Sequence, residues 1–218
     1  MRKVILLSCV FLVSFNFYCQ DSNINSNKKT FFGFKAGFNY FKQSSNENSN
    51  SAKYNGGFGY QLGTTLNIPM SKHSTFVPEL LFQRISTGYE YLNQYSNGKT
   101  LEEVKYKINI FFIPLNFKFD IINNVDLEFG PSVGLTLSNS KEISYTTELN
   151  GIVKNSKYEE DIKGGFYVFG FNLGTNYNLN KNIYAGLRYS ILFNSYSNGS
   201  SVLKSGLFAI SAGYNFKK

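Results

Sequence analysis

Few side chains in this sequence are suited to catalysis. The chain has a single histidine, His73, which follows Lys72 in a short predicted turn. A Ser-His-acid arrangement would need its nucleophile at the same end of the fold, with this histidine as the base. A solvated turn residue is the simpler interpretation of His73, so the sequence predicts a protein that is not an enzyme and holds no cofactor.

Three consecutive acids, Glu159, Glu160 and Asp161, could in principle bind a cation. Calcium sites need several oxygen ligands in an ordered frame, and these residues do not have the spacing of an EF-hand loop. We interpret them as part of a solvated acidic loop and predict no metal site.

Six other charged residues interrupt runs of small or polar side chains inside predicted strands. Lys35, Glu79, Glu128 and Arg188 are predicted to lie at similar depth on one side of a sheet. Two acids and two bases at one level suggest an ion-pair network, and a selectivity filter is the alternative interpretation. If a turn over residues 120–124 pairs Phe119 with Val125, Lys118 lies opposite Asp126, with Glu128 as its diagonal neighbour.

The elements that must position these charges are predicted to be β-strands. From residue 207 to 218, large apolar side chains occupy every second position and small or polar ones occupy the others, which is the period of a strand. Similar alternation recurs about eight times. The predicted strands cover residues 31–41, 57–68, about 75–85, 104–119, 125–137, about 167–177, 183–193 and 207–218.

The fourth predicted strand changes phase in its middle. Its apolar residues are even-numbered up to Phe112 and odd-numbered from Leu115 onward, with Pro114 between them. A β-bulge at Pro114 would restore one continuous apolar face.

The connections alternate between long and short. Long polar loops are predicted at residues 42–55, 86–103, 138–164 and 195–201, and short turns at 69–74, 120–124 and 178–182. In outer-membrane barrels the turns on the periplasmic side are short and the external loops are longer. The pattern therefore predicts that both termini are periplasmic.

The direction of the apolar face separates a membrane barrel from a soluble barrel or sandwich. Eight strands with four to six bulky residues each would supply about forty large side chains, whereas an eight-stranded barrel has room inside for few. The complementary face is mostly Gly, Ser, Thr and Asn, which suits a narrow polar interior. The predicted fold class is all-β, an eight-stranded antiparallel up-and-down transmembrane β-barrel.

The N-terminus has the layout of an export signal. Arg2 and Lys3 precede an apolar run that is too short to span a membrane as a helix. We expect residues 1–19 to be a cleaved signal peptide, residues 20–30 a polar periplasmic leader, and residues 31–218 the barrel domain. A lipid-modified Cys19 is the alternative, but Tyr18 stands where lipoprotein signals generally have a small residue. With cleavage after Cys19, Cys9 and Cys19 both leave with the signal.

Short motifs within this frame resemble the PorT-like outer-membrane β-barrel family of Gram-negative bacteria. They are Pro78-Glu79-Leu80-Leu81, Ile113-Pro114-Leu115, Gly130-Pro131-Ser132-Val133-Gly134 and a terminal Gly-Tyr-Asn-Phe-Lys. The resemblance covers roughly residues 31–218 and implies insertion into the outer membrane, and the founding name of the family implies a role in protein secretion. Many barrels end in an aromatic residue that the assembly machinery reads, and here Tyr214 and Phe216 would form that signal, although two lysines follow Phe216.

The expected function is a structural or surface-interaction role through the external loops. The alternatives are an accessory of a secretion or envelope-assembly machine and a narrow pore for small solutes. The expected partners are outer-membrane lipid, the barrel assembly machinery and an unknown surface or periplasmic protein. Nucleic acid is not an expected partner, because the lysines behind the net charge of +8 are scattered singly rather than gathered in a stripe.

Overall fold

The computed structural model describes residues 29–43, 52–96, 98–149, 152–162, 167–195 and 202–216. The predicted signal peptide, most of the leader, part of each long loop and the two final lysines lie outside these residues. The described chain forms nine strands: β1 (Phe31–Gln43), β2 (Ala52–Pro69), β3 (Ser74–Tyr95), β4 (Gly98–Ile122), β5 (Val125–Leu149), β6 (Ile152–Asp161), β7 (Tyr167–Asn178), β8 (Ile183–Ser195) and β9 (Val202–Asn215).

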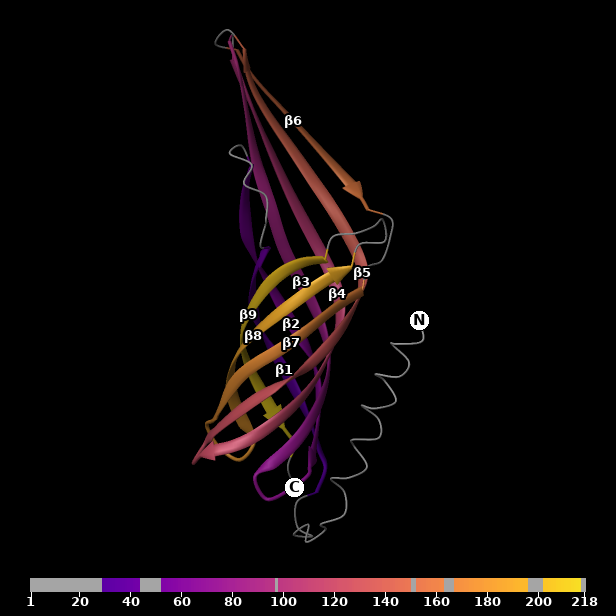
Figure 1. Cartoon of the computed structure of the whole chain (residues 1–218), viewed down its shortest axis with the longest axis vertical. Coiled ribbons are helices and arrows are strands. Elements are labelled where there is room, and N and C mark those ends of the chain that lie inside the picture. Colours follow the sequence, from indigo (N-terminus) through magenta and orange to yellow (C-terminus); the bar gives the residue numbers. More distant parts are fainter. Residues whose placement is uncertain are drawn as a thin grey trace.

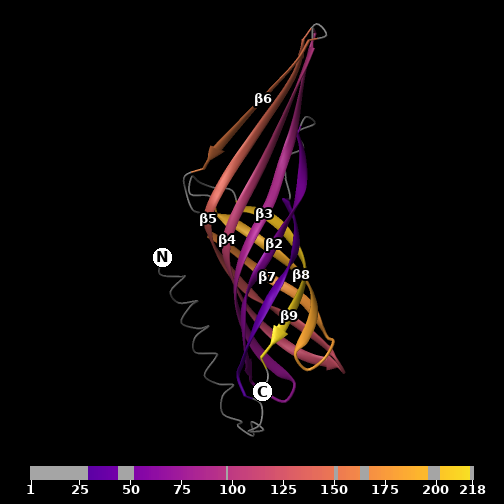
Figure 2. The ribbon, with the colours of Figure 1, turned by 180° about the vertical axis from the view of Figure 1, so that it is seen from behind.

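Eight of these strands close into an antiparallel barrel. Each strand pairs with the next along the chain, β7 follows β5 in the ring, and β9 pairs with β1 to complete it. The ninth strand, β6, pairs only with the second half of β5 and lies outside the ring. Figures 1 and 2 show the barrel below and a group of longer strands that continue above it. The all-β barrel predicted from the sequence is confirmed.

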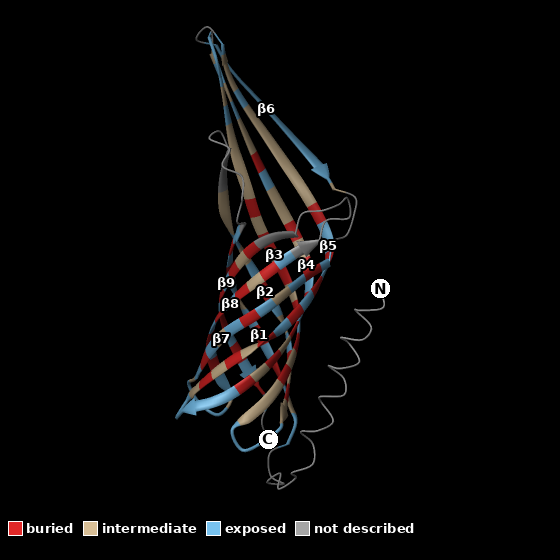
Figure 3. Ribbon diagram, in the orientation of Figure 1, coloured by how far each residue is buried: buried red, intermediate tan, exposed pale blue. Residues whose placement is uncertain are grey.

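The barrel is apolar outside and polar through much of its interior. Along β1, β7, β8 and β9, buried residues alternate with exposed ones, and the exposed residues are large and apolar. Examples are Phe38 of β1 at 76% and Phe169 of β7 at 54% exposure, whereas Lys35 and Arg188 on the inner side are each 3% exposed. Figure 3 shows this alternation along the wall. No helix in the described part of the chain combines the length and apolar character that crossing a membrane requires.

Two regions predicted as loops are strands. Residues 86–103 continue β3 and begin β4, and most of 138–164 forms the end of β5 and all of β6. The polar composition of these segments suggested loops because it cannot form a core. Ladder hydrogen bonds and cross-strand side-chain pairs hold them as strands instead. β3, β4 and β5 consequently have 22, 25 and 25 residues, whereas about 9–11 suffice to cross a membrane.

The bulge predicted at Pro114 is also wrong. Even-numbered residues of β4 face inward on both sides of this proline, from Ile108 and Phe112 to Asn116. The even-numbered apolar residues before Pro114 therefore fill the interior, whereas Phe111 and Ile113 lie on the outer face. The irregularity lies between Asn109 and Ile110, where β5 carries an extra residue, Leu137. This bulge keeps the inner face continuous as β5 leaves the barrel.

Three turns join strands at one end of the barrel, at residues 70–73, 123–124 and 179–182. We call this the turn end, and the opposite end, where β3 to β6 project, the blade end. The start of β1 and the end of β9 lie at the turn end (Figure 1). Asn124 has a φ of 69°, a left-handed conformation that asparagine tolerates better than most residues.

Candidate functional site

A compact ion-pair network lies inside the barrel. The guanidinium group of Arg188 donates to Glu79 through both terminal nitrogens, at 2.9 and 2.6 Å, and to Glu128 through Nε at 2.7 Å. Lys35 Nζ lies 3.3 Å from Glu79 Oε1 and 3.9 Å from Glu128 Oε1. All four side chains are at most 3% exposed. The four residues that the sequence grouped by depth therefore meet at one point.

These charges converge because β1, β3, β5 and β8 each contribute one inward-facing residue at the same level. Each charge interrupts a run of small or polar side chains, such as Gly37 and Asn39 beside Lys35. Gly174 on the neighbouring strand makes room, because a Cβ there would lie 2.9 Å from Glu128 Oε1. The alternation of side chains along the strands is thus sufficient to place all four groups in the lumen.

Three asparagines that were not predicted from the sequence complete the network. Asn176 donates to Glu128 Oε2 at 2.8 Å, and Asn116 donates to Glu79 Oε1 at 3.4 Å. Asn172 in turn donates to Asn116 Oδ1 at 3.2 Å. Their inward parity was visible in the sequence, but nothing distinguished these amides from the other polar residues on the inner face.

A second ion pair lies nearer the turn end, in a register that differs from the predicted one. Lys118 lies opposite Glu128, and Asp120 lies opposite Asp126. The two-residue Asn123-Asn124 turn is tighter than predicted, which moves β5 by two residues relative to β4. Lys118 Nζ still reaches Asp126 Oδ2 diagonally, at 3.3 Å, and lies 5.1 Å from the centre of the Tyr184 ring. The predicted pair is present, although the predicted alignment is wrong.

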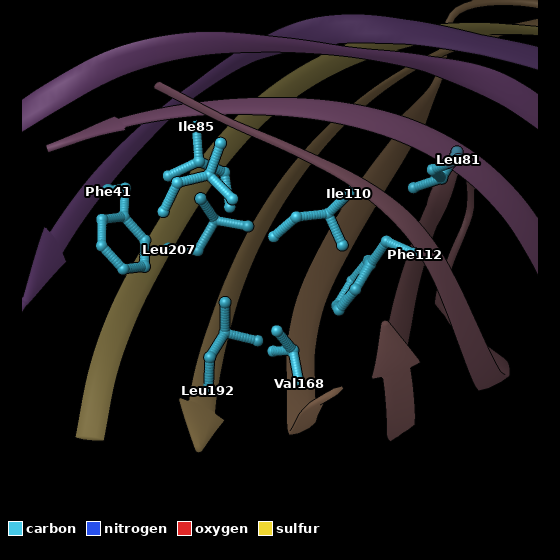
Figure 4. Packing of buried hydrophobic residues seen from close by; sticks show 9 residues of the cluster. Phe41, Leu81, Ile85, Ile110, Phe112, Val168, Leu192 and Leu207 are labelled. Atoms are coloured by element: carbon cyan, nitrogen blue, oxygen red, sulfur yellow. The ribbon is translucent and has the colours of Figure 1, made fainter. Parts of the chain in front are cut away.

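The blade-end half of the lumen holds an apolar cluster beside buried polar side chains such as Gln61 and Gln83. Residues from six strands form one buried cluster, which comprises Phe41, Leu81, Ile85, Ile108, Ile110, Phe112, Val168, Leu192 and Leu207. Figure 4 shows these side chains directed toward one another across the barrel. The sequence predicted a narrow polar interior throughout, and this cluster shows that the prediction was wrong for this level of the lumen. The ion-pair network and the cluster fill successive levels of the lumen.

The turn end of the barrel opens into a cavity of about 1510 Å³. Its lining includes Lys29, Lys72, His73, Lys118 and Lys181, together with the carboxylates of Asp120 and Asp126. His73 is exposed in its turn, and its backbone N–H donates to Ser71 Oγ at 3.3 Å. Cationic groups thus outnumber anionic ones around this mouth.

The two aromatic residues proposed as an assembly signal lie on the outer surface at the turn end. Tyr214 and Phe216 are 44% and 51% exposed, and their ring centres are 5.1 Å apart. Phe216 also packs edge-on against Phe34 at 5.6 Å. Its backbone N–H donates to the carbonyl oxygen of Phe32 at 2.8 Å, so the last described residue still belongs to the closing seam.

Beyond the barrel, four strands form a projecting sheet that we call the blade. It comprises residues 86–95 of β3, 98–107 of β4, 139–149 of β5 and all of β6, and residues 52–56 of β2 pair along the outer part of β3 beside them. Every residue of β6 is exposed (Figure 3). At about 3.3 Å per residue, ten residues extend roughly 30 Å. Glu159, Glu160 and Asp161 lie within β6, and no group of acids, histidines or cysteines in the described residues is arranged to hold a metal ion.

One face of the blade, which we call the charged face, carries cross-strand ion pairs. Lys99 pairs with Glu148 at 3.0 Å. Glu142 on β5 accepts from Lys107 on β4 at 3.3 Å and from Lys157 on β6 at 3.0 Å. The hydrogen bonds from Lys157 and Lys107 lower the pKa of Glu142. These pairs link β4, β5 and β6 on the charged face of the blade.

The opposite face, which we call the tyrosine face, has a different composition. The strand registers place on it the six tyrosines that β3 to β6 contribute to the blade, and it also carries Val104 and Ile143. The tyrosines are Tyr89, Tyr91, Tyr95, Tyr106, Tyr145 and Tyr158. At its base this face continues the inward-facing side of the barrel wall, through Ile85 and Ile108.

Comparison with known proteins identifies one matching family and several similar structures. Residues 19–198 match the family described as "Outer membrane protein beta-barrel domain". No curated protein matches the chain. Similar solved structures include Ail of Yersinia pestis in complex with the heparin analogue sucrose octasulfate (12% identity, TM-score 0.43, 87% of this chain and 100% of that chain). Neisserial surface protein A aligns at 14% identity with a TM-score of 0.41 over 87% of this chain and 100% of that chain. OprG of Pseudomonas aeruginosa aligns at 12% identity with a TM-score of 0.39, over 90% and 100%.

Proposed function

Because this chain belongs to the outer membrane protein β-barrel domain family, it is an outer-membrane protein, and we propose that it acts as a non-enzymatic surface-interaction protein. The observation that carries this proposal is the blade. Strands β3, β4 and β5 are about twice as long as a membrane crossing requires. A barrel that served only to fill the membrane would not need a sheet extending roughly 30 Å beyond it.

A rigid scaffold that presents an extended surface is a common arrangement for binding. The blade fits this arrangement because its strands grow directly out of the barrel wall. Its position is therefore fixed relative to the membrane, and its ion pairs hold β4, β5 and β6 together. Through the blade, the protein would engage a partner outside the cell.

Shortening the blade tests this proposal. In the variant, a short Gly/Ser linker replaces residues 141–163, which removes β6 and the part of β5 beyond Ser140. The barrel should still fold, since the β5–β7 seam ends at Leu135 and the removed segment adds little buried surface. Intact cells are then treated with a membrane-impermeant crosslinker. Adducts of the full chain that disappear in the shortened variant would support the proposal, and adducts that persist unchanged would contradict it.

We extend the proposal to topology and processing. Residues 1–19 would be removed as a signal peptide, both termini would be periplasmic, and Tyr214 and Phe216 would be read by the assembly machinery. The motifs around Pro78, Pro114 and Pro131 support placement in the PorT-like branch of the barrels. Protease added to intact cells should cleave the blade and spare residues 179–182. Cleavage only after the outer membrane is opened would reverse the topology.

One observation favours a second candidate function, docking to an envelope machine from the periplasmic side. The cavity at the turn end is lined by four lysines and opens away from the blade. Replacing Lys72 and Lys181 with glutamine should weaken such docking without affecting the blade. A narrow pore is a less suitable function for this barrel, because the ion-pair network and the apolar cluster both lie across its lumen.

A further inference from the structure

Four polar residues inside the barrel belong neither to the ion-pair network nor to the apolar cluster. Asn39 on β1 and Ser190 on β8 face inward between the network and the cluster. Gln61 on β2 and Gln83 on β3 lie opposite each other beside the cluster. All four residues are at most 3% exposed.

These four residues carry polar atoms that have no hydrogen-bond partner among the described residues. The atoms are Nδ2 and Oδ1 of Asn39, Nε2 of Gln61, Oε1 of Gln83 and Oγ of Ser190. The two glutamines are joined by one hydrogen bond, in which Gln83 Nε2 donates to Gln61 Oε1 at 2.9 Å. A buried polar atom without a partner costs about as much free energy as a lost hydrogen bond, so folded proteins seldom leave one in that state.

The strand registers bring the three amides together. Gln61 lies opposite Gln83 of β3 and opposite Gly37 of β1. Asn39 is the next inward-facing residue of β1 after Gly37, so it is the diagonal neighbour of Gln61 on the inner face. The three amides, on three adjacent strands, therefore form one polar patch on the inner wall.

The residues beside Asn39 are small. Its two cross-strand neighbours are Gly59 on β2 and Ala209 on β9. A Cβ at Gly59 would lie 2.6 Å from Asn39 Oδ1, so this glycine makes room for the amide. Ala209 in turn has Ser190 as its diagonal neighbour on β8. The small side chains of Gly59 and Ala209 thus fill little of the lumen around the polar atoms.

The polar atoms themselves define the chemistry of a ligand. Two of them are donors, two are acceptors, and the Ser190 hydroxyl group can act as either. An ion would be bound by dipoles of one sense only, and an apolar molecule would leave all of these atoms unpaired. Water both donates and accepts, and a buried water typically makes about three hydrogen bonds to groups that otherwise lack a partner.

We propose that the lumen binds a small cluster of water molecules at the three amides and Ser190, where the ion-pair network meets the apolar cluster. The waters accept hydrogen bonds from Asn39 Nδ2 and Gln61 Nε2 and donate to Asn39 Oδ1 and Gln83 Oε1. This hydration explains why three amides lie next to packed aliphatic and aromatic side chains. The inference goes beyond the proposed function and does not depend on it.

NMR of the purified full chain in detergent micelles provides the first test. Rotating-frame NOEs separate a bound water from proton exchange, because the two processes give cross-peaks of opposite sign. The side-chain amide protons of Asn39 and Gln61 should show NOEs to water. Asn172 is the matched control, because its amide is fully buried and donates to Asn116 Oδ1 at 3.2 Å. The inference is overturned if Asn39 and Gln61 show no more contact with water than Asn172 does.

The second test replaces Asn39 with leucine, which has a similar size but no polar atoms. In a dry lumen, Asn39→Leu would remove two unpaired groups and raise the equilibrium constant for folding. In a hydrated lumen it removes partners of the waters, so the constant should fall about tenfold. Urea titration, followed by the gel mobility of the folded form, measures the constant. An unchanged or increased constant would reject the water cluster.

A second variant covers the case in which Asn39→Leu does not fold. Asn39→Ser keeps a donor and an acceptor and leaves room for one more water molecule. The NOEs between Gln61 and water should therefore persist in this variant. Their loss in a folded Asn39→Ser barrel would contradict the inference.

Discussion

At the level of single residues, Arg188 is the group on which the lumen network depends most. It makes three hydrogen bonds to two carboxylates, and in its absence these carboxylates would keep Lys35 and the neutral amides of two asparagines beside them. Arg188→Met should lower the free energy of unfolding by about 3–5 kcal/mol, because it leaves buried negative charge without compensation. Urea titration in detergent, followed by the gel mobility of the folded form, measures this. Lys181→Met in an exposed turn is the control, and equal losses in both variants would argue against the network.

Lys118 and Asp126 allow a test of coupling. Lys118→Met should destabilise the barrel because the carboxylate of Asp126 is nearly buried beside it. Adding Asp126→Asn should recover part of that loss, since no charge is then left unpaired. The four unfolding free energies of the double-mutant cycle measure the coupling. Strict additivity would mean that the diagonal contact contributes nothing.

The residues of the lumen were predictable to different degrees. Lys35, Glu79, Glu128 and Arg188 could be identified because a charge among small side chains stands out in a strand of period two. Asn116, Asn172 and Asn176 could not, since amides are common on the same face. The ion pair of Lys118 with Asp126 was predicted correctly, but from a turn that was too long. The shorter turn shifts the register of β5 against β4 by two residues.

At the level of elements, Glu142 links three strands of the blade. Hydrogen bonds from Lys157 and Lys107 lower its pKa below the ordinary 4.5. A carboxyl group with a lowered pKa in the folded state stabilises that state above its unfolded pKa, and the contribution disappears as the pH falls through the lowered value. The pairing of β6 with β5 should therefore loosen below about pH 4.5.

Amide hydrogen exchange of β6 measures this loosening. Protection should fall between pH 7 and acid, after correction for the intrinsic exchange rate. In Glu142→Gln the protection should already be low at pH 7 and change less with pH. A wild-type β6 whose protection is independent of pH would show that the ion pairs do not hold this strand.

The blade is the element that the sequence predicted least well. Loops and polar strands have similar composition, and the expectation of a buried face for each strand favoured loops. The alternation of Tyr89, Tyr91 and Tyr95 was the feature of the sequence that indicated a strand. The pairing of this segment with β4 could not be predicted, because it depends on the register of the two strands. The eight barrel strands were predictable because the membrane selects one apolar face for each of them.

At the level of the whole molecule, the two filled levels of the lumen determine whether ions can pass. An eight-stranded barrel has an interior that side chains can just fill. Here the ion-pair network fills one level and the apolar cluster fills the next, so an ion would have to displace both in turn. Planar-bilayer recordings of the purified chain should accordingly show no discrete conductance steps.

Variants that remove side chains from one level of the lumen test whether the other level alone still blocks the passage of ions. Phe112→Ala with Ile85→Ala removes bulk from the apolar cluster but leaves Arg188 bound to both carboxylates, so the barrel should remain closed. These losses should also reduce stability by about 2–5 kcal/mol for each residue, the usual effect of a cavity in a packed interior. Recordings are therefore interpreted only for protein with the gel mobility of a folded barrel. Conductance steps in the wild-type chain would mean that the lumen opens spontaneously, and the pore hypothesis would then replace the surface-interaction one.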